Sequence, residues 1–483
     1  MWKTCRWYVR CGYASYSDSE KQVASSKEAI VSESRTPIQE SAAASGAEVA
    51  SGRGSRWQVA GRALRHRNFQ LFFSGQLISL IGTWMQSVAQ SWLVYRLTGS
   101  ALLLGSVGFA SQVPVFLFAP LGGMTADRFN RRRIVISTQV AAMVLAFILA
   151  VLTLTHEIDH RVWIIFVLAA LLGVVNAFDI PGRQSFLVEM VGKEDLMNAI
   201  ALNSSMFNGA RVIGPAIAGI LVAKIGEGWC FFANAVSYIA VIVGLLMMRV
   251  HSPARASMAS PFEHMMEGFR FVNRTAPIRA LLLLLGVVSL VGMPYVVLMP
   301  IFADQILHGG ARGLGILMGA TGVGALLGAL TLAFREGVKG LGRWVAWCSA
   351  GFGASLIVFA ISHTFWVSVI LLLPVGYTIM LQMASSNTLI QVMVPDALRG
   401  RVMAVYSTMF MGMAPIGALL GGALAERLGA PVTVSIGGIA SVAGACWFGI
   451  QLPKIRVEAR RLIVAQAVAG GEPAEMTTQV VED

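Results

Sequence analysis

Long apolar segments, separated by short polar ones, fill the chain from Phe69 to about Leu452. An α-helix needs about 20 apolar residues to cross the hydrocarbon core of a bilayer, and a chain that crosses repeatedly satisfies its backbone groups within helices. The sequence therefore predicts an all-α membrane protein with twelve transmembrane helices. The predicted spans are residues 69–95, 101–125, 133–154, 162–180, 199–222, 229–248, 279–303, 313–334, 344–362, 365–384, 400–424 and 431–452.

Three segments lie outside the spans. Residues 1–60 are rich in Ser, Ala and Glu, which predicts a disordered cytoplasmic tail; the alternative is that translation starts later and part of this segment is never made. The linker 249–278 contains Pro261–Asn273, whose apolar positions recur at helical spacing and predict a helix lying on the membrane surface. Residues 453–483 form a second predicted cytoplasmic tail.

The composition is typical of a membrane protein, and the positions of the Lys and Arg residues account for the net positive charge. Hydrophobic residues make up 56% of the chain and charged residues 13%, whereas soluble domains carry about 25% charged residues. The formal net charge is +12, but the Lys and Arg residues lie in short loops between spans, without the basic and aromatic patch of a nucleic-acid-binding protein. We therefore expect the lipid bilayer, and no nucleic acid, as a partner.

The distribution of Lys and Arg among the loops predicts the orientation. Cytoplasmic loops carry an excess of these residues, and alternate loops of this chain are much richer in them than the loops between. We therefore expect both termini in the cytoplasm, an even number of spans and a multi-pass protein of the bacterial cytoplasmic membrane. The basic residues on the predicted cytoplasmic side include Arg62, Arg65, Arg128, Arg131, Arg132, Arg133, Arg183, Arg335, Lys339, Arg343, Arg399, Arg401, Lys454 and Arg456.

The second half of the chain repeats the first. Met190–Gly226 aligns without a gap with Met393–Gly429, at a constant shift of 203 residues. The fifth span therefore matches the eleventh, and six spans of the same topology form an N-terminal bundle at 61–248 and a C-terminal bundle at 279–452. Parallel halves of this kind place a substrate site between them, near the middle of the membrane.

A charged turn, Gly123–Arg133, joins the second and third spans. Glycine lets helices pack closely, so we expect Gly123 at a helix contact. Asp127 can pair with a neighbouring arginine or accept hydrogen bonds from a helix N-terminus, and such a cluster could hold one gate closed. The alternative is that the arginines only anchor the topology. The predicted gating motif comprises Gly123, Asp127, Arg128, Arg131 and Arg132.

These residues make the chain resemble the major facilitator superfamily, whose loop between spans two and three reads Gly-x-x-x-Asp-Arg-x-Gly-Arg-Arg/Lys. Asn130 replaces the second glycine, and asparagine also tolerates left-handed backbone geometry. The resemblance covers residues 65–455. Asp179–Phe186 and Val394–Val402 look like the branch that holds the enterobactin exporter and macrolide efflux proteins, which implies proton-driven export.

The same two segments supply a second group of charged residues. They follow the fourth and tenth spans on the predicted cytoplasmic side, a position that suits a gate better than a substrate pocket. The candidate cytoplasmic gate comprises Asp179, Pro181, Arg183, Asp396, Arg399 and Arg401.

The fifth span resembles the antiporter motif of the superfamily through Gly209, Gly214, Pro215 and Gly219, with Ala218 in place of one glycine. Small residues allow tight helix contact and the proline permits a bend. The alternative is that these glycines serve packing alone.

Arg211 lies near the middle of the fifth span, and an intramembrane arginine is a functional hypothesis by default. It could bind an anionic or catecholate-like substrate, or pair with a proton-carrying acid; the alternative is a structural partner such as Asn208 or Gln86. No acid stands out in the first or fourth span, so the sequence does not identify the proton carrier. Other polar candidates for substrate or coupling are Asn208, Gln86, Gln90, Tyr238, Tyr295 and Tyr377.

Enzymatic and ATP-driven functions find no support in the motifs. His156–His160 reads His-Glu-Ile-Asp-His, but the zinc-protease mechanism needs both histidines on one helix face, and this segment is a short predicted outer loop. No phosphate-binding Gly-x-x-x-x-Gly-Lys-Ser/Thr loop occurs. We expect no catalytic residue, no metal and no cofactor.

The sequence therefore predicts a secondary active transporter that acts as a monomer. The favoured activity is proton-coupled efflux of a small organic compound, drug-like or siderophore-like, by alternating access. The alternatives are a substrate-specific uptake transporter and a transport-inactive receptor or scaffold. Polar residues retained within the spans favour transport, because a scaffold has no need of them.

Overall fold

The computed structural model describes residues 62–192, 194–248, 261–335 and 337–469. The predicted tail at 1–60, residues 249–260 of the predicted linker and the end of the second tail lie outside the described residues. The chain divides into two compact units, Met1–Arg62 and Ala63–Asp483. Every α-helix named below lies in the second unit.

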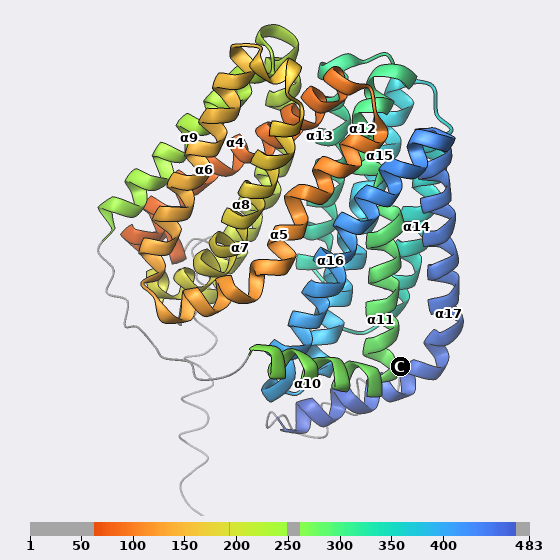
Figure 1. The fold of residues 1–483 in the computed structure, drawn as a ribbon. Coiled ribbons are helices and arrows are strands. Elements are labelled where there is room, and N and C mark those ends of the chain that lie inside the picture. Colours follow the sequence, from red (N-terminus) through yellow and green to blue (C-terminus); the bar gives the residue numbers. More distant parts are fainter. Residues whose placement is uncertain (1–61, 193, 249–260, 336, 470–483) are drawn as a thin grey trace, which may run out of the picture. The chain divides into compact units, whose positions relative to one another are not determined.

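The second unit consists of long helices joined by short loops (Figure 1). We call residues 63–248 the first half and residues 261–469 the second half. The helices of the first half are α4 (Arg67–Thr98), α5 (Ala101–Arg128), α6 (Arg131–Leu154), α7 (Trp163–Val191), α8 (Leu196–Ile225) and α9 (Glu227–Met247). Those of the second half are α10 (Pro261–Arg274), α11 (Ala276–Val287), α12 (Tyr295–Ile301), α13 (Gly310–Ala333), α14 (Leu341–Ala360), α15 (Phe365–Met393), α16 (Asp396–Leu428) and α17 (Ala430–Ala469).

Eleven helical segments of the described chain are long and apolar enough to cross a membrane, with α11 and α12 counted as one segment, Ala276–Ile306. The remaining predicted span, α4, is long enough with 32 residues, but it is less apolar than these eleven segments. Its polar side chains Gln76, Ser79 and Gln86 are buried against neighbouring helices, and α4 packs along α8 and α9. Neighbouring helices therefore bury the polar side chains that α4 would otherwise expose.

The seventh span is interrupted twice by π-helical turns, η3 (Val288–Gly292) and η4 (Phe302–Ile306), on either side of α12. Inserted turns of this kind are often found at functional sites. The hydroxyl of Ser289, within η3, donates a 2.9 Å hydrogen bond to the carbonyl oxygen of Phe410 in α16. This hydrogen bond thus connects the seventh span to the eleventh within the second half.

Several helices run further than predicted. The fourth span was expected to end at residue 180, but α7 continues to Val191 with Pro181 inside it. Likewise α15 continues to Met393, and α17 passes through Pro453 to Ala469. In α7 the polar residues that resemble a loop are satisfied inside the bundle, because Asp179 is buried with partners from α6.

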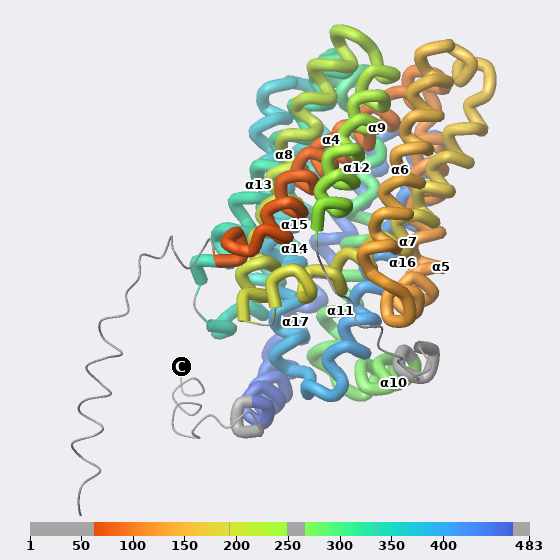
Figure 2. Tube along the Cα trace, turned by 90° about the vertical axis from the view of Figure 1, so that its left-hand side faces the viewer, coloured from red at the N-terminus to blue at the C-terminus, as the bar shows by residue number. Residues whose placement is uncertain are grey.

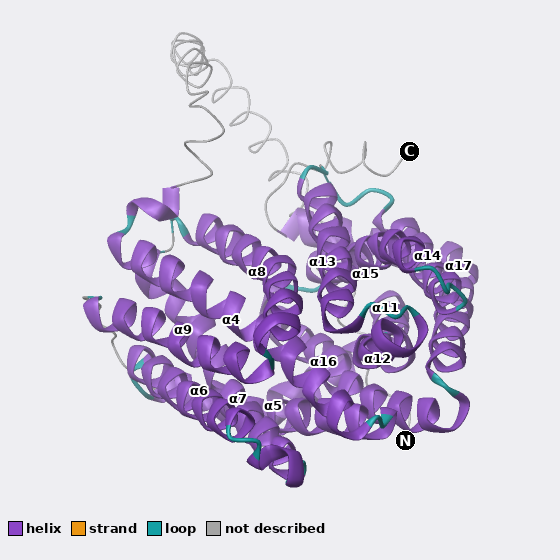
Figure 3. Cartoon of the chain, turned by 90° about the horizontal axis from the view of Figure 1, so that it is seen from above, coloured by secondary structure: helices purple, strands orange, loops and turns teal. Residues whose placement is uncertain are grey.

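The repeat in the sequence has a counterpart in the backbone. Helices α8 and α16 both end at a glycine with positive φ, Gly226 at 88° and Gly429 at 84°. A left-handed φ of this kind favours glycine because it has no Cβ. Each of the two helices also packs on the opposite half, α8 against α13 and α16 against α5 (Figure 3).

The loops define two ends of the second unit. The Gly99 end holds the turns at Gly99, Gly226 and Gly429, and the Asn130 end holds the turn between α5 and α6 and the segment from α9 to α11. Helix α10 packs against α16 at the Asn130 end, where a Cβ on Gly268 would lie 2.6 Å from the carbonyl oxygen of Arg401. The helix predicted at Pro261–Asn273 is therefore present and is seated on the second half.

Candidate functional site

Polar contacts join the two halves at the Gly99 end. The hydroxyl of Tyr95, in the last turn of α4, donates a 2.9 Å hydrogen bond to Asp304 of η4. The carboxylate of Glu426 in α16 accepts hydrogen bonds from the Ser100 hydroxyl and the Leu102 amide, both at 3.1 Å. Within the described residues, the hydrogen bonds between the halves lie at this end, so the Gly99 end is closed.

Close backbone approaches seal the same region. A Cβ on Gly105 of α5 would lie 2.3 Å from the carbonyl oxygen of Ala418 in α16, and a Cβ on Gly315 of α13 would lie 2.6 Å from that of Pro215 in α8. Real Cβ atoms do not approach so closely, so both positions need glycine. Toward the Asn130 end α5 and α16 separate (Figure 1). The halves therefore meet at one end and diverge at the other.

Arg211 of α8 lies beside an aromatic pair at the level where the halves meet. Its guanidinium carbon is 5.7 Å from the ring centroid of Trp84 in α4, and the Trp84 ring contacts Phe207 edge-on at 5.6 Å. The other half approaches here as well, because a Cβ on Gly322 of α13 would lie 3.1 Å from the carbonyl oxygen of Arg211. No carboxylate within the described chain pairs with Arg211, which leaves a cation among aromatic rings.

The structural partners expected as an alternative for Arg211 are engaged elsewhere. The amide nitrogen of Asn208 donates to the carbonyl oxygen of Ser204 in its own helix at 2.9 Å. Gln86 accepts a 2.7 Å hydrogen bond from Asn234 of α9, where both side chains are buried. Gln86 and Asn208 therefore serve the interior of the first half.

The remaining polar candidates divide by exposure. Tyr238 and Tyr295 are buried, and within the described part of the chain no side chain or backbone group lies in hydrogen-bonding position to the Tyr295 hydroxyl. Gln90 and Tyr377 are partly exposed. A role in binding substrate stays a prediction for each of them.

The charged turn differs in detail from the expected packing. Gly123 has open space around its Cβ position, whereas a Cβ on Gly122 would lie 2.0 Å from the carbonyl oxygen of Ala177 in α7. The predicted close helix contact is thus made one residue earlier. Asn130 has φ −63° and ψ 113°, so the expectation of left-handed backbone at this residue is wrong. Its side chain instead accepts the amide of Arg133 and caps α6.

The arginines of the turn have different partners. Arg131 pairs with Glu189 of α7 at 2.7 Å and donates to the carbonyl oxygen of Ala126. Arg132 donates to the carbonyl oxygens of Leu245 and Leu246 at the end of α9, both at 2.8 Å, and so caps the C-terminus of this helix. Asp127 and Arg128 are exposed. The expected pairing of Asp127 with an arginine is absent from the contacts that the structure describes.

Asp179 is one of two buried acids in the described chain, with Glu227 the other. It accepts hydrogen bonds from Thr138 at 2.9 Å and Gln139 at 2.8 Å, both on α6. Arg183, one turn further along α7, lies 3.3 Å from its second oxygen. The carboxylate therefore sits inside the first half with three polar partners, rather than at the helix end predicted for it.

The gate candidates of the second half form contacts within that half. Arg399 pairs with Asp396 in the first turn of α16, and Arg401 pairs with Glu267 of α10. Pro181 of α7 lies against the Gly122 contact in the first half. The structure thus keeps the two groups of gate candidates in separate halves.

The glycines of the antiporter-like motif have unequal roles. A Cβ on Gly214 would lie 2.5 Å from the Cβ of Trp84, and one on Gly219 would lie 2.9 Å from the Cα of Gly315. Gly209 faces open space. The motif therefore seats α8 against α4 on one side and against α13 on the other, and three of its four residues take part.

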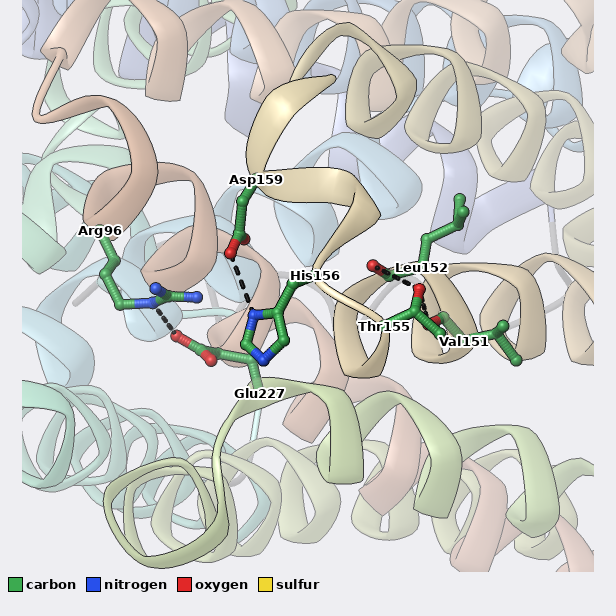
Figure 4. A network of polar contacts seen from close by, with 7 residues as sticks. All are labelled: Arg96, Val151, Leu152, Thr155, His156, Asp159 and Glu227. Carbon is green, nitrogen blue, oxygen red and sulfur yellow. Dashed lines mark hydrogen bonds and ion pairs between the residues drawn. The ribbon is translucent and has the colours of Figure 1, made fainter.

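The zinc-protease-like segment forms a short helix, η2 (Glu157–His160), at the Gly99 end. His156 precedes it with φ 61° and contacts Asp159 at 3.1 Å, while Glu227 pairs with Arg96 at 2.7 Å nearby (Figure 4). No group of three or more potential metal ligands occurs among the described residues. The segment therefore serves as a loop between α6 and α7.

Sequence reasoning did not select four residues that the structure brings into the site. They are Trp84 and Phe207 beside Arg211, and Tyr95 and Glu426 at the closed end. An aromatic residue within one helix is ordinary in a membrane protein. The helical spacing of Phe207 and Arg211, four residues apart on α8, is the one signal in the sequence that they share a face.

The helices and paired halves have the fold of the major facilitator superfamily, and solved structures share this fold. The nucleoside transporter NupG superposes with a TM-score of 0.64 at 13% identity, covering 81% of this chain and 99% of NupG. A mutant of the peptide transporter POT superposes with a TM-score of 0.64 at 15% identity, covering 80% and 94%. The chain belongs to the transmembrane secretion effector family, whose sequence profile matches residues 60–469.

Two relatives with known names are similar to the chain in sequence. The staphyloferrin A transporter of Staphylococcus aureus is 27% identical over 380 residues, which cover 77% of this chain and 93% of the relative. The enterobactin exporter EntS of Shigella boydii is 25% identical over 396 residues, covering 82% and 93%. The chain is thus similar over nearly the full length of both siderophore transporters.

Proposed function

We propose that the chain exports a small anionic compound of the siderophore type from the cytoplasm by alternating access. The observation that carries the proposal is Arg211, a cation within the membrane that lacks a carboxylate partner among the described residues and lies beside Trp84. An intramembrane cation is costly, and an anionic ligand would compensate it. The names of the relatives supply the class of ligand.

The aromatic rings suit the same ligand. Trp84 and Phe207 offer apolar faces on either side of the Arg211 charge. Pockets for organic ligands combine apolar walls with a few fixed polar groups. Helix α13 of the second half approaches the Arg211 backbone at Gly322, so both halves would border the bound compound.

The direction of access follows from loop charge. The positive-inside rule assigns the Asn130 end, which carries Arg131, Arg132 and Arg343, to the cytoplasm. With the Gly99 end closed by Tyr95 and Asp304, the conformation described would be the inward-facing one. An exporter in this state would load its substrate from the cytoplasm.

The gate would involve Asp127. Because α5 and α16 pack at the Gly99 end, closing the Asn130 end would bring the end of α5 toward the first turn of α16. The exposed Asp127 would then meet the helix N-terminus at Asp396–Arg401, whose free amide groups and Arg399 favour a carboxylate. Asp127 would thus stabilise the outward-facing state.

Proton coupling is assigned to Asp179. It is a buried carboxylate held by Thr138, Gln139 and Arg183, and ionisable residues inside membranes mark proton relays. Taking up a proton would weaken its attraction for Arg183 and free that side chain. The coupling would therefore act within α6 and α7 of the first half.

The test measures efflux of a panel of siderophore-type compounds from cells that express the full chain, with and without a protonophore. Export should fall with the protonophore and with Arg211→Gln, and Arg211→Lys should restore part of it. The exposed Arg427→Gln variant is the matched control and should export normally. Accumulation inside the cells would identify an importer, and no transport of any compound would favour the receptor or scaffold alternative.

A further inference from the structure

A pocket opens at the Asn130 end of the second half, apart from the Arg211 region. It lies between α11, α15, the α13–α14 loop and the last part of α17. Its floor is apolar, with Leu281, Leu389 and Phe448 among its lining residues. Phe448 is fully buried and the two leucines nearly so. The floor thus continues the apolar interior of the second half toward the surface.

The rim of this pocket is basic. Lys339 and Arg343 come from the α13–α14 loop and the start of α14, and Arg456 and Arg460 from consecutive turns of α17. None of the lining residues that the structure describes is acidic. Lys339 and Arg460 have further polar partners, whereas Arg343 and Arg456 are exposed. Arg343 and Arg456 are therefore placed to meet a ligand from outside.

The course of α17 gives the pocket its position. Leu452, Ile455, Ala459 and Ile463 line it at intervals of three or four residues, which puts them on one face of the helix. Figure 1 and Figure 2 show this last part of α17 turning across the Asn130 end, near α10. The pocket therefore lies where apolar spans give way to a basic surface.

We propose that this pocket binds an anionic phospholipid of the cytoplasmic leaflet. The acyl chains would lie on the Leu281 and Phe448 floor, and the phosphate would contact Arg343 and Arg456. Basic pockets between helices on the cytoplasmic side suit such headgroups, and arginine binds phosphate oxygens through paired donors. The assignment to the cytoplasmic leaflet rests on the orientation proposed above. The match between the basic rim of the pocket and an anionic headgroup does not depend on that orientation.

The experiment is native mass spectrometry of the full chain in neutral detergent, titrated with dioleoyl phosphatidylglycerol or dioleoyl phosphatidylcholine. Each basic side chain contributes about fivefold to the binding of anionic lipid. The double variant Arg343→Gln/Arg456→Gln should therefore lose roughly 25-fold in phosphatidylglycerol affinity. The control Lys454→Gln/Arg461→Gln removes the same charge from side chains outside the pocket and should lose much less.

Four results would overturn the proposal. Equal affinity for both lipids, or an equal loss in the two double variants, would mean that diffuse surface charge is responsible. Displacement of phosphatidylglycerol by equimolar glycerol 3-phosphate would mean that the pocket binds phosphate without acyl chains. Lipid binding seen only after Glu472, Glu475, Glu482 and Asp483 are replaced by their amides would make the acidic end of the chain the occupant. Because binding is read without transport, these results are independent of the export assay.

Discussion

The hydroxyl of Tyr95 and the carboxylate of Asp304 lie 2.9 Å apart and belong to different halves of the chain. Tyr95 lies in the last turn of α4, and Asp304 lies in a π-helical turn of the seventh span. A hydrogen bond to a charged group contributes about 1.5–3 kcal/mol, so this contact favours the conformation in which the Gly99 end is closed.

Tyr95→Phe should shift the population toward the conformation open at the Gly99 end by at least tenfold, because the hydrogen bond lost is worth about 1.5 kcal/mol or more. Spin labels at Phe129 and Gly400, both on the Asn130 end, would report a larger fraction of short distances. Tyr406→Phe is the matched control, because the Tyr406 hydroxyl bonds Met383 within one half. An unchanged distance distribution in Tyr95→Phe would contradict the role given to this contact.

Gly105→Ala should separate α5 from α16, because the added Cβ would lie 2.3 Å from the carbonyl oxygen of Ala418. Overpacking a tight contact costs about 1–3 kcal/mol, here paid only when the Gly99 end is closed. Transport should fall at least tenfold. Gly209→Ala, which adds the same methyl group in open space, should leave transport unchanged; similar losses in both variants would argue against the close contact.

Arg132→Gln should destabilise the first half by about 1–2 kcal/mol, because Arg132 caps the carbonyl groups of Leu245 and Leu246. Arg133→Gln removes the same charge from an exposed neighbour and should stay within about 0.5 kcal/mol. Thermal unfolding of the purified chain measures the difference. If both variants unfold at the same temperature, the capping hydrogen bonds of Arg132 do not stabilise the first half, and Arg132 contributes through its charge alone.

Asp127→Asn should leave stability unchanged and lower transport at least tenfold. The side chain is exposed here, so its loss disturbs little in this conformation, whereas the proposed outward-facing state needs the carboxylate. Glu458→Gln, an exposed position of α17 at the same end, is the control for a generic loss of negative charge. A drop in melting temperature for Asp127→Asn, with transport intact, would contradict a gating role.

Asp179→Asn should abolish the response of transport to a proton gradient, because an amide takes up no proton. The neutral side chain keeps a hydrogen-bond acceptor for Thr138 and Gln139, so the fold should persist. Counterflow of substrate without a gradient should continue in this variant. If gradient-driven export were retained, the proton carrier would have to be another group.

The arrangement of helices could be predicted from the sequence because apolarity and repetition are properties of whole segments. The match of Met190–Gly226 to Met393–Gly429 anticipated two helices that end in the same left-handed glycine geometry. Helix ends were harder to predict. Asp179 and Pro181 suggest a loop by composition, but buried partners on α6 keep them within α7.

Contacts between particular side chains were the least predictable. The motif indicated a close helix contact at Gly123, and the structure makes it at Gly122, because helix rotation decides which of two adjacent glycines faces α7. Asn130 caps a helix where left-handed backbone was expected. The neighbours of Arg211 come from α4 and α13, and no local pattern in the sequence shows which distant helices meet α8.

The polar character of α4 bears on how the chain is made. Transfer of a nascent helix from the translocon into lipid depends on its apolarity, and α4 is the least apolar of the long helices of the first half. Its buried Gln86 finds its partner, Asn234, on α9. During synthesis α4 is therefore expected to remain beside the translocon until α8 and α9 emerge. The first half would then enter the bilayer as a group of helices.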